Sequence, residues 1–240
     1  MTAPKLSVMM PVYNREKFVG AAIESVLNQT FTDFKLLIYN DGSTDGTEDI
    51  IQDYAKKDSR VTPVYRVDDQ EKRVSVVNHG VAFARNILLA ACETPIACYQ
   101  DSDDLSHPQR LQHQLKMVQP DEMIFTSWEW FMETPKKEYW DRVEPYTRSQ
   151  RAYASVMFYI DKGIKYDEKI VLGGEDTDWL GRMLKNRRQV ILPELLYFIR
   201  NHEDRIGIWK SRIQSNFAPH ELTGVSYADA IKMYKTKKGG

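Results

Sequence analysis

Three carboxylates follow an apolar stretch near the middle of the chain. Asp101, Asp103 and Asp104 come directly after residues 95–99, which read as a buried strand. Carboxylates this close repel one another unless a cation lies among them. Hard oxygen ligands suit Mg²⁺ or Mn²⁺, which keep coordination positions open for phosphate oxygens. The spacing therefore predicts a divalent cation site, although Asp103 or Asp104 could instead cap the helix expected at 108–118.

Two further polar segments follow apolar stretches in the first half of the chain. Tyr13 and Asn14 come after residues 6–10, a run closed by Pro11, and Asp41 comes after residues 34–39. In an open α/β sheet, ligands bind beyond the carboxyl ends of the strands. These side chains are therefore candidates for ligand contact, with a plain polar turn as the alternative for each segment taken alone.

The elements needed to position these residues are those of a doubly wound, largely parallel α/β sheet. Apolar runs alternate with amphipathic segments over the first 115 residues, which is typical of right-handed βαβ units. Strands are predicted at 6–10, 34–39, 61–66 and 95–99, and helices around 21–27, from the capping residues 43–45 through 54, and at 80–91. The later pattern predicts helices at 108–118, 149–160 and 175–186, a strand at 123–127, an extended segment at 190–199 and a polar helical end.

No repeat or low-complexity linker divides the sequence. We expect one unit over 1–240, with a nucleotide-binding half at 1–115 and an acceptor-binding half at 116–240 that share one sheet. The 42% apolar and 28% charged residues are typical of a globular protein. The net charge of −1 gives no general attraction to nucleic acid.

Location and redox state follow from what the sequence lacks. No apolar run is long enough to span a bilayer and no leader pattern opens the chain, so we expect a cytoplasmic location. The lysine-bearing tail at 232–240 is either a frayed terminus or a peripheral contact with anionic lipid. Cys92 and Cys98 are expected to be reduced core thiols rather than a disulfide or zinc ligands.

Four segments of the first 115 residues stand in a characteristic order and spacing. They are Pro11-Val12-Tyr13-Asn14, residues 40–47, residues 78–86, and Asp101-Ser102-Asp103-Asp104 with Pro108, Arg110, Leu111 and Gln114. Together they resemble the family 2 glycosyltransferases. The resemblance implies a GT-A fold and the metal-dependent, inverting transfer of a sugar from a nucleotide-diphosphate donor, most often UDP-linked, to an acceptor hydroxyl. The nucleotide-binding half at 1–115 would then bind the nucleotide sugar.

The same resemblance implies roles for single residues. Pro11, Tyr13 and Asp41 would hold the pyrimidine base, and Arg85 would help to bind the donor. Asp101 and Ser102 would contact the ribose or sugar, and Asp103 would ligate Mn²⁺ or Mg²⁺. The sequence departs from the family at Asn40, where a second aspartate is common.

A carboxylate pair in the second half, Glu175-Asp176, follows two glycines at a predicted helix start. Acids are favoured in the first turn by the helix dipole alone. The resemblance implies instead that Asp176 accepts the proton of the acceptor hydroxyl, with direct displacement and inversion, while Glu175 orients the acceptor or the base.

Some later residues have two interpretations each. His202 resembles a late histidine that meets the metal or the diphosphate, but a lone loop histidine is often exposed. Arg200 and Arg205 could bind phosphate or be surface charges. Trp128, Trp130, Trp140 and Trp179 could stack on sugar or pack in the core. Only Trp179 is predicted at the acceptor, because it adjoins Asp176.

Two other functions compete with glycosyl transfer. A sugar nucleotidyltransferase would need a Gly-rich, basic loop after the first strand to hold a triphosphate, where this chain has residues 11–14. A non-catalytic nucleotide- or carbohydrate-binding module would bind donor without turnover. The sequence does not identify the transferred sugar or the acceptor, because both depend on pocket contacts.

Overall fold

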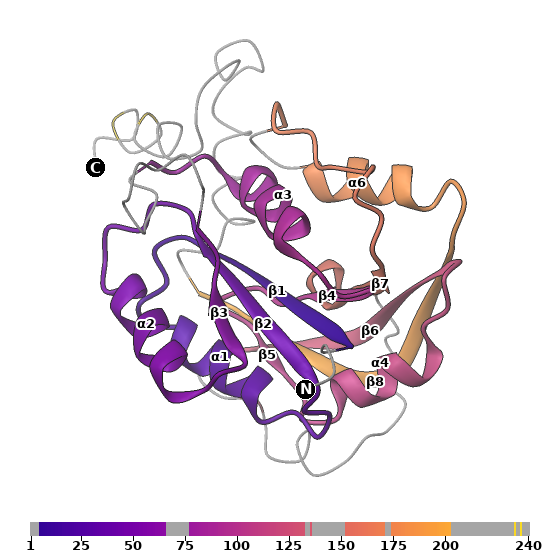
Figure 1. The fold of residues 1–240 in the computed structure, drawn as a ribbon, viewed down its shortest axis with the longest axis horizontal. Helices are drawn as coiled ribbons and strands as arrows, with labels where there is room; N and C mark the ends of the chain where they lie inside the picture. Colours follow the sequence, from indigo (N-terminus) through magenta and orange to yellow (C-terminus); the bar gives the residue numbers. More distant parts are fainter. Residues whose placement is uncertain are drawn as a thin grey trace.

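One eight-stranded sheet runs through the part of the chain that the structure describes (Figure 1). The structure is a computed structural model that describes residues 5–65, 77–132, 135, 152–170, 174–202, 233 and 236. The strand order is β3-β2-β1-β4-β7-β6-β8-β5. The strands are β1 (Leu6–Val12), β2 (Phe34–Asn40), β3 (Val61–Pro63), β4 (Ile96–Tyr99), β5 (Leu105–Ser106), β6 (Glu122–Phe131), β7 (Met157–Tyr159) and β8 (Arg188–Arg200). The helices are α1 (Val19–Leu27), α2 (Thr47–Lys57), α3 (Val81–Ala91), α4 (Arg110–Met117), the 3₁₀ turn η1 (Tyr153–Ser155) and α6 (Glu175–Met183).

The sheet is mostly parallel, as predicted. β1 pairs in parallel with β2 and β4, β2 with β3, and β6 with β8. β7 is antiparallel to both β4 and β6, and the short β5 is antiparallel to β8. The mixed α/β class is confirmed, and strands from both halves of the chain share the sheet.

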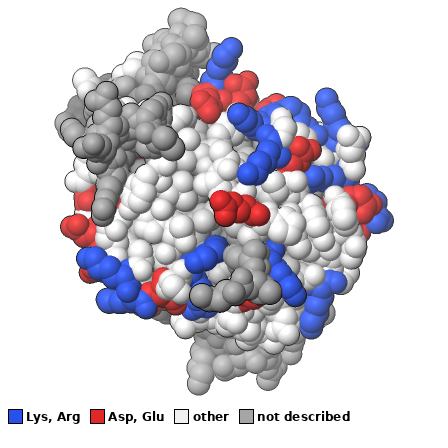
Figure 2. All heavy atoms as spheres, in the orientation of Figure 1, with Lys and Arg blue, Asp and Glu red and all other residues white. Residues whose placement is uncertain are grey.

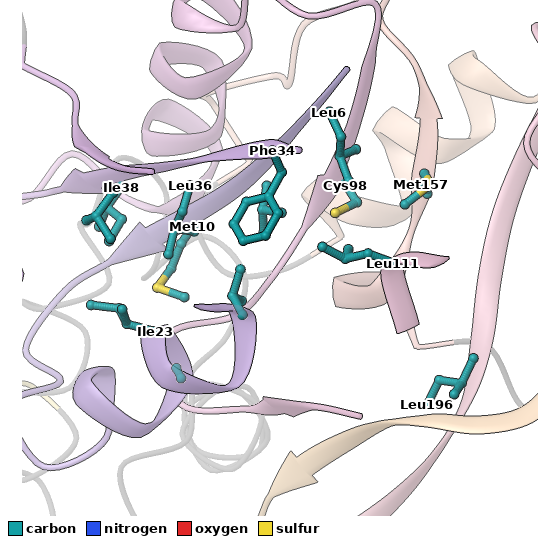
Figure 3. Packing of buried hydrophobic residues seen from close by; sticks show 14 of the residues in the cluster. Leu6, Met10, Ile23, Phe34, Leu36, Ile38, Cys98, Leu111, Met157 and Leu196 are labelled. Carbon is teal, nitrogen blue, oxygen red and sulfur yellow. The ribbon is translucent and has the colours of Figure 1, made fainter. Parts of the chain in front are cut away.

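The strands bury both faces, because successive side chains point to opposite sides. Leu6, Val8 and Met10 of β1 belong to one hydrophobic cluster with α1, α2 and α4, part of which Figure 3 shows. Met9 and β2 Leu37 belong to the other cluster, with α3 and α6. This two-sided burial explains why the first strands read as continuous apolar runs.

The helix predicted over 149–160 is wrong where the structure describes it. Residues 153–155 form η1, and Met157–Tyr159 form β7 between β4 and β6. Phe158 and Met157 face opposite clusters, so pairing between two buried strands overrides the local pattern. The strand at 123–127 also extends, as β6, through Phe131. The polar helical end lies outside the described residues, apart from 233 and 236.

Cys92 and Cys98 are free, buried thiols, which confirms the prediction. Burial raises the pKa of the Cys98 thiol. None of the described helices is long and apolar enough to cross a membrane. Over the face shown in Figure 2, basic and acidic side chains are interspersed.

Candidate active site

The carboxyl ends of four strands meet at one edge of the sheet. The pairing aligns Val12 of β1 with Asn40 of β2, and Met9 of β1 with Tyr99 of β4. β8 runs in the direction of β6, and β7 is antiparallel to both β6 and β4, so Arg200 ends at the same edge. Residues 13–16, 41–46, 100–104 and 201–202 therefore gather where the fold class places ligands.

The loop after β1 is tied to the loop after β2. Asn14 has a φ of 50°, and its backbone N–H donates to Ser43 Oγ over 2.9 Å. The Asn14 side-chain oxygen accepts from the Thr44 N–H over 2.8 Å. Pro11 does not close β1 as expected, since it pairs with Tyr39 inside the strand. A proline fits there because the β1–β4 ladder ends at Met9.

Asp41 organises the segment that leads into α3. Its carboxylate accepts backbone N–H bonds from His79 at 3.0 and 3.1 Å and from Gly80 at 2.7 Å. Burial raises the pKa of Asp41, and these N–H bonds oppose the rise. Asn40, the departure from the family, donates to Glu48 and accepts from the Ser43 N–H, so its amide fixes the turn.

The acidic cluster lies at the end of β4. Ligand oxygens of Asp101, Asp103 and Asp104 lie within 4.8 Å of one another. Asp103 Oδ2 contacts Arg15 Nε at 3.0 Å and His202 Nε2 at 3.1 Å. Asp104 Oδ1 accepts the backbone N–H of Arg200. In the described chain α4 has no side-chain cap, so the capping alternative for these carboxylates does not hold.

The surroundings of the two inner carboxylates differ. Burial raises the pKa of Asp103, but the His202 hydrogen bond and the Arg15 charge outweigh it and lower that pKa below its usual value. Burial and the charges of Asp103 and Asp101 raise the pKa of Asp104 well above its usual value. The charges of Asp101 and Asp103 thus act against ionisation of Asp104, and a cation bound among the three carboxylates would relieve this repulsion.

The residues present fit a divalent ion. Carboxylate oxygens are hard ligands, and His202 adds a ring nitrogen against the same Asp103 oxygen. His202 is largely buried, and its Nδ1 has no hydrogen-bond partner in the described structure. The interpretation of His202 as an exposed loop histidine is therefore wrong.

Arg85 of α3 joins the acidic cluster to α6. Its guanidinium contacts Asp176 and lies 3.8 Å from both Asp101 and Glu175. Burial lowers the pKa of Arg85, but these carboxylates, Asp176 first among them, and the nearby Tyr166 raise it well above its usual value. Arg85 is therefore a fixed positive charge between the two sets of carboxylates.

Glu175 and Asp176 begin α6 immediately after Gly174, whose φ is +97°. Glu175 is buried, with its side chain 3% exposed, whereas the side chain of Asp176 is 30% exposed. Only Asp176 of this pair is open enough to meet an acceptor. The different exposures fit the different roles expected for the two residues.

Comparison with known proteins decides the family. The model described as "Glycosyl transferase family 2" matches residues 7–174. The chain belongs to glycosyltransferase family 2. It is 36% identical over 122 residues to an uncharacterized glycosyltransferase of Rickettsia bellii, which covers 51% of this chain and 16% of that protein. It is 35% identical over 115 residues to a putative teichuronic acid biosynthesis glycosyltransferase of Bacillus subtilis, which covers 48% of this chain and 42% of that protein.

Solved structures share the fold of this glycosyltransferase. Staphylococcus aureus TarS 1-349, in complex with UDP-GlcNAc, superposes with a TM-score of 0.67 at 18% identity, over 97% of this chain and 66% of that one. A mannosyltransferase of Pyrobaculum calidifontis, in complex with GDP-Man and Mn²⁺, has a TM-score of 0.64 at 16% identity, over 95% of this chain and 70% of that one. The GT-A fold is confirmed. The chain spans less than half the length of each of the two curated relatives named above.

Trp179 is a core residue. Its side chain is 1% exposed, its ring stacks on Tyr166 at 4.9 Å between centroids, and its Nε1 donates to the Ile164 carbonyl. A sugar cannot reach a ring enclosed in this way, so the acceptor contact predicted from its neighbour Asp176 is not supported. α6 exposes Asp176 and buries Trp179 because residues three apart need not share the same exposed arc of a helix. Arg205 and Trp140 lie outside the described residues.

A buried polar network, which sequence reasoning missed, supports the acidic turn. Arg110 is fully buried, and it donates to Gln100 Oε1, to Ser106 Oγ and to the Tyr99 carbonyl. The Tyr197 hydroxyl accepts the Asp101 backbone N–H over 3.1 Å. Arg110 was visible only as a motif residue, and its burial depends on α4 packing under the turn. Ser102 is buried in the same turn, and Arg200 donates to the Asp103 carbonyl.

Proposed function

We propose that this chain is an inverting, metal-dependent glycosyltransferase that moves a sugar from a UDP-linked donor to an acceptor hydroxyl during polysaccharide synthesis. The observation that carries the proposal is the arrangement of two sets of carboxylates around Arg85, one at a cation-compatible corner and one partly open on α6. A cation held by the first set would suit the leaving diphosphate, and the open carboxylate of the second set suits the attacking hydroxyl.

The donor side is assigned to residues 1–115. We propose that Pro11, Tyr13 and Asp41 hold the uracil, and that Asp101 and Ser102 contact the ribose or sugar. Asp103 and His202 would hold Mn²⁺ or Mg²⁺. Such an ion, when bound, neutralises the charge that develops on the departing diphosphate. The UDP-GlcNAc and GDP-Man complexes of the two similar folds support a nucleotide-sugar donor.

The acceptor side is assigned to residues 116–240. Asp176 would take the proton of the acceptor hydroxyl as that oxygen attacks the anomeric carbon. The buried Glu175 would hold the start of α6 and, through Arg85, orient Asp176. Attack from the side opposite the leaving group inverts the configuration in one displacement. The relative named for teichuronic acid biosynthesis supports a polysaccharide product.

The test is calorimetric titration of UDP and of GDP, each with and without Mn²⁺, followed by a screen of nucleotide sugars for donor hydrolysis. We expect UDP to bind only in the presence of Mn²⁺, more tightly than GDP, and we expect one UDP-sugar to be hydrolysed slowly. Equal UDP binding without Mn²⁺ and no hydrolysis of any donor would show a binding module instead. Tighter binding of GDP would replace the proposed donor class.

A further inference from the structure

We propose that Arg15 acts in two successive states of the donor site. Without a bound cation, Arg15 neutralises the charge of Asp103. When a cation is bound to Asp103, Arg15 binds the donor diphosphate instead. This inference rests on the proposed function and adds a phosphate-binding residue to it. Arg15 has no assigned role in the motifs considered above.

Arg15 is held at the acidic corner by several contacts. Its Nε lies 3.0 Å from Asp103 Oδ2, and the two side chains are only 11% and 15% exposed. Its Nη1 donates to the Asn14 carbonyl at 2.9 Å and to the Tyr13 carbonyl at 3.3 Å. Its backbone N–H donates to Thr47 Oγ1 at 2.8 Å. Nη2 makes no hydrogen bond within the described residues, so two N–H donors of the fork have no acceptor.

A cation on Asp103 competes directly with this contact. A divalent ion that used Asp103 Oδ2 would lie next to a guanidinium that keeps its charge at all ordinary pH values. His202 meets the same oxygen through a ring nitrogen, which is itself of a type that can ligate a metal ion. Arg15 has no such option, and like charges repel at this distance. An ion bound through Oδ2 would therefore displace Arg15 from Asp103 and leave its charge without an anion at that oxygen.

The other carboxylates of the cluster do not offer Arg15 that anion. Asp101 faces Arg85 at 3.8 Å, and Asp104 accepts the Arg200 backbone N–H. The anion that reaches this corner together with the ion is the diphosphate of the donor. The planar fork of a guanidinium matches phosphate oxygens, and the two N–H donors of Arg15 Nη2 have no acceptor among the residues that the structure describes. A short movement of the Arg15 side chain would thus replace its ion pair with Asp103 by a contact with phosphate.

The test is calorimetry on Arg15→Gln, first with Mn²⁺ alone and then with UDP at saturating Mn²⁺. We expect Arg15→Gln to bind Mn²⁺ at least about threefold more tightly than the wild type does, because a competing positive charge is gone. We expect UDP to bind about tenfold more weakly, because a charge-assisted hydrogen bond is lost. Arg60→Gln is the matched control, since it also removes an arginine from a partly exposed ion pair, with Asp58, and should change neither affinity.

The opposite directions of the two changes make the result decisive. Weaker binding of both Mn²⁺ and UDP would mean that Arg15 only orders its loop, and unchanged UDP affinity would remove it from the diphosphate; either result overturns the inference. Arg15→Lys keeps the charge, so its Mn²⁺ affinity should stay within about twofold of the wild type and its UDP loss should be smaller than that of Arg15→Gln. Wild-type protein that fails to bind UDP with Mn²⁺ would instead overturn the proposed function.

Discussion

Replacing Asp176 by Asn separates the proposed chemistry from structural support. The two side chains have nearly the same shape, but the amide cannot accept the acceptor proton. Loss of a general base costs about 10²–10⁴-fold in turnover, or about 2.7–5.4 kcal/mol in activation free energy. UDP affinity should remain that of the wild type, because Asp103 and the base-binding loops are untouched.

The structural cost of the same change is limited by the partners that Arg85 keeps. The Asp176 side chain is 30% exposed, and in the wild type Glu175 and Asp101 also lie 3.8 Å from the Arg85 guanidinium. Because Arg85 itself is buried, loss of its closest carboxylate costs more than loss of a surface pair, about 1–3 kcal/mol of unfolding free energy. Chemical denaturation of both proteins checks that the variant stays folded, so that a fall in turnover of a hundredfold or more reports the lost base.

Asp178→Asn is the control from the same helical turn. The Asp178 side chain is 37% exposed and is paired with Arg182, so this variant also removes a partly exposed Asp–Arg pair from α6. The assay is UDP release from the hydrolysed donor at saturating Mn²⁺, together with UDP calorimetry for all three proteins. Turnover of Asp176→Asn within about threefold of the wild type, or an equal fall in Asp178→Asn, would refute the assignment of Asp176 as the base.

Four further substitutions test other parts of the protein. Asp103→Ala should abolish Mn²⁺-dependent UDP binding in calorimetry, and an unchanged affinity would end its role as a ligand. Asp41→Ala should reduce the preference for UDP over GDP, measured as the ratio of the two dissociation constants, and a retained ratio would count against base recognition. Gly42→Ala should lower stability by about 1–3 kcal/mol in chemical denaturation, because φ is +77° and the new Cβ would lie 2.6 Å from the Val77 carbonyl carbon. Gly181→Ala, in open space on α6, should instead raise stability by about 0.5–1 kcal/mol, and a similar loss in both variants would contradict this account.

The pattern of apolar and polar residues was sufficient to predict the strands of the first half of the fold. Residues 6–10 and 34–39 are apolar on both faces, and a strand between two helical layers needs that composition. The polar motifs at the strand ends followed from the same reasoning, because parallel strands deliver their carboxyl ends to one edge. Asp103 and His202 meet at this edge although 99 positions separate them.

The second half was less accessible because its elements depend on partners distant in the sequence. β7 has only three residues, within the apolar run 156–160, and the local pattern of so short a run does not distinguish a strand from a buried helical turn; the pairing with β4 and β6 decides it. Trp179 adjoins the open carboxylate Asp176 in sequence and yet lies in the core. Adjacency along a helix does not determine which face is buried, since that depends on what the helix packs against.

Residue types and strand-end positions can be read from the amino-acid sequence alone, and they indicate the family and the kind of chemistry. Which charges meet can be known only from the three-dimensional fold, because an ion pair depends on distance in space. It placed Arg15 on Asp103, 88 positions away, and Arg85 on Asp176, 91 positions away. Those contacts turn a set of separate motifs into one site whose charges can be tested against one another.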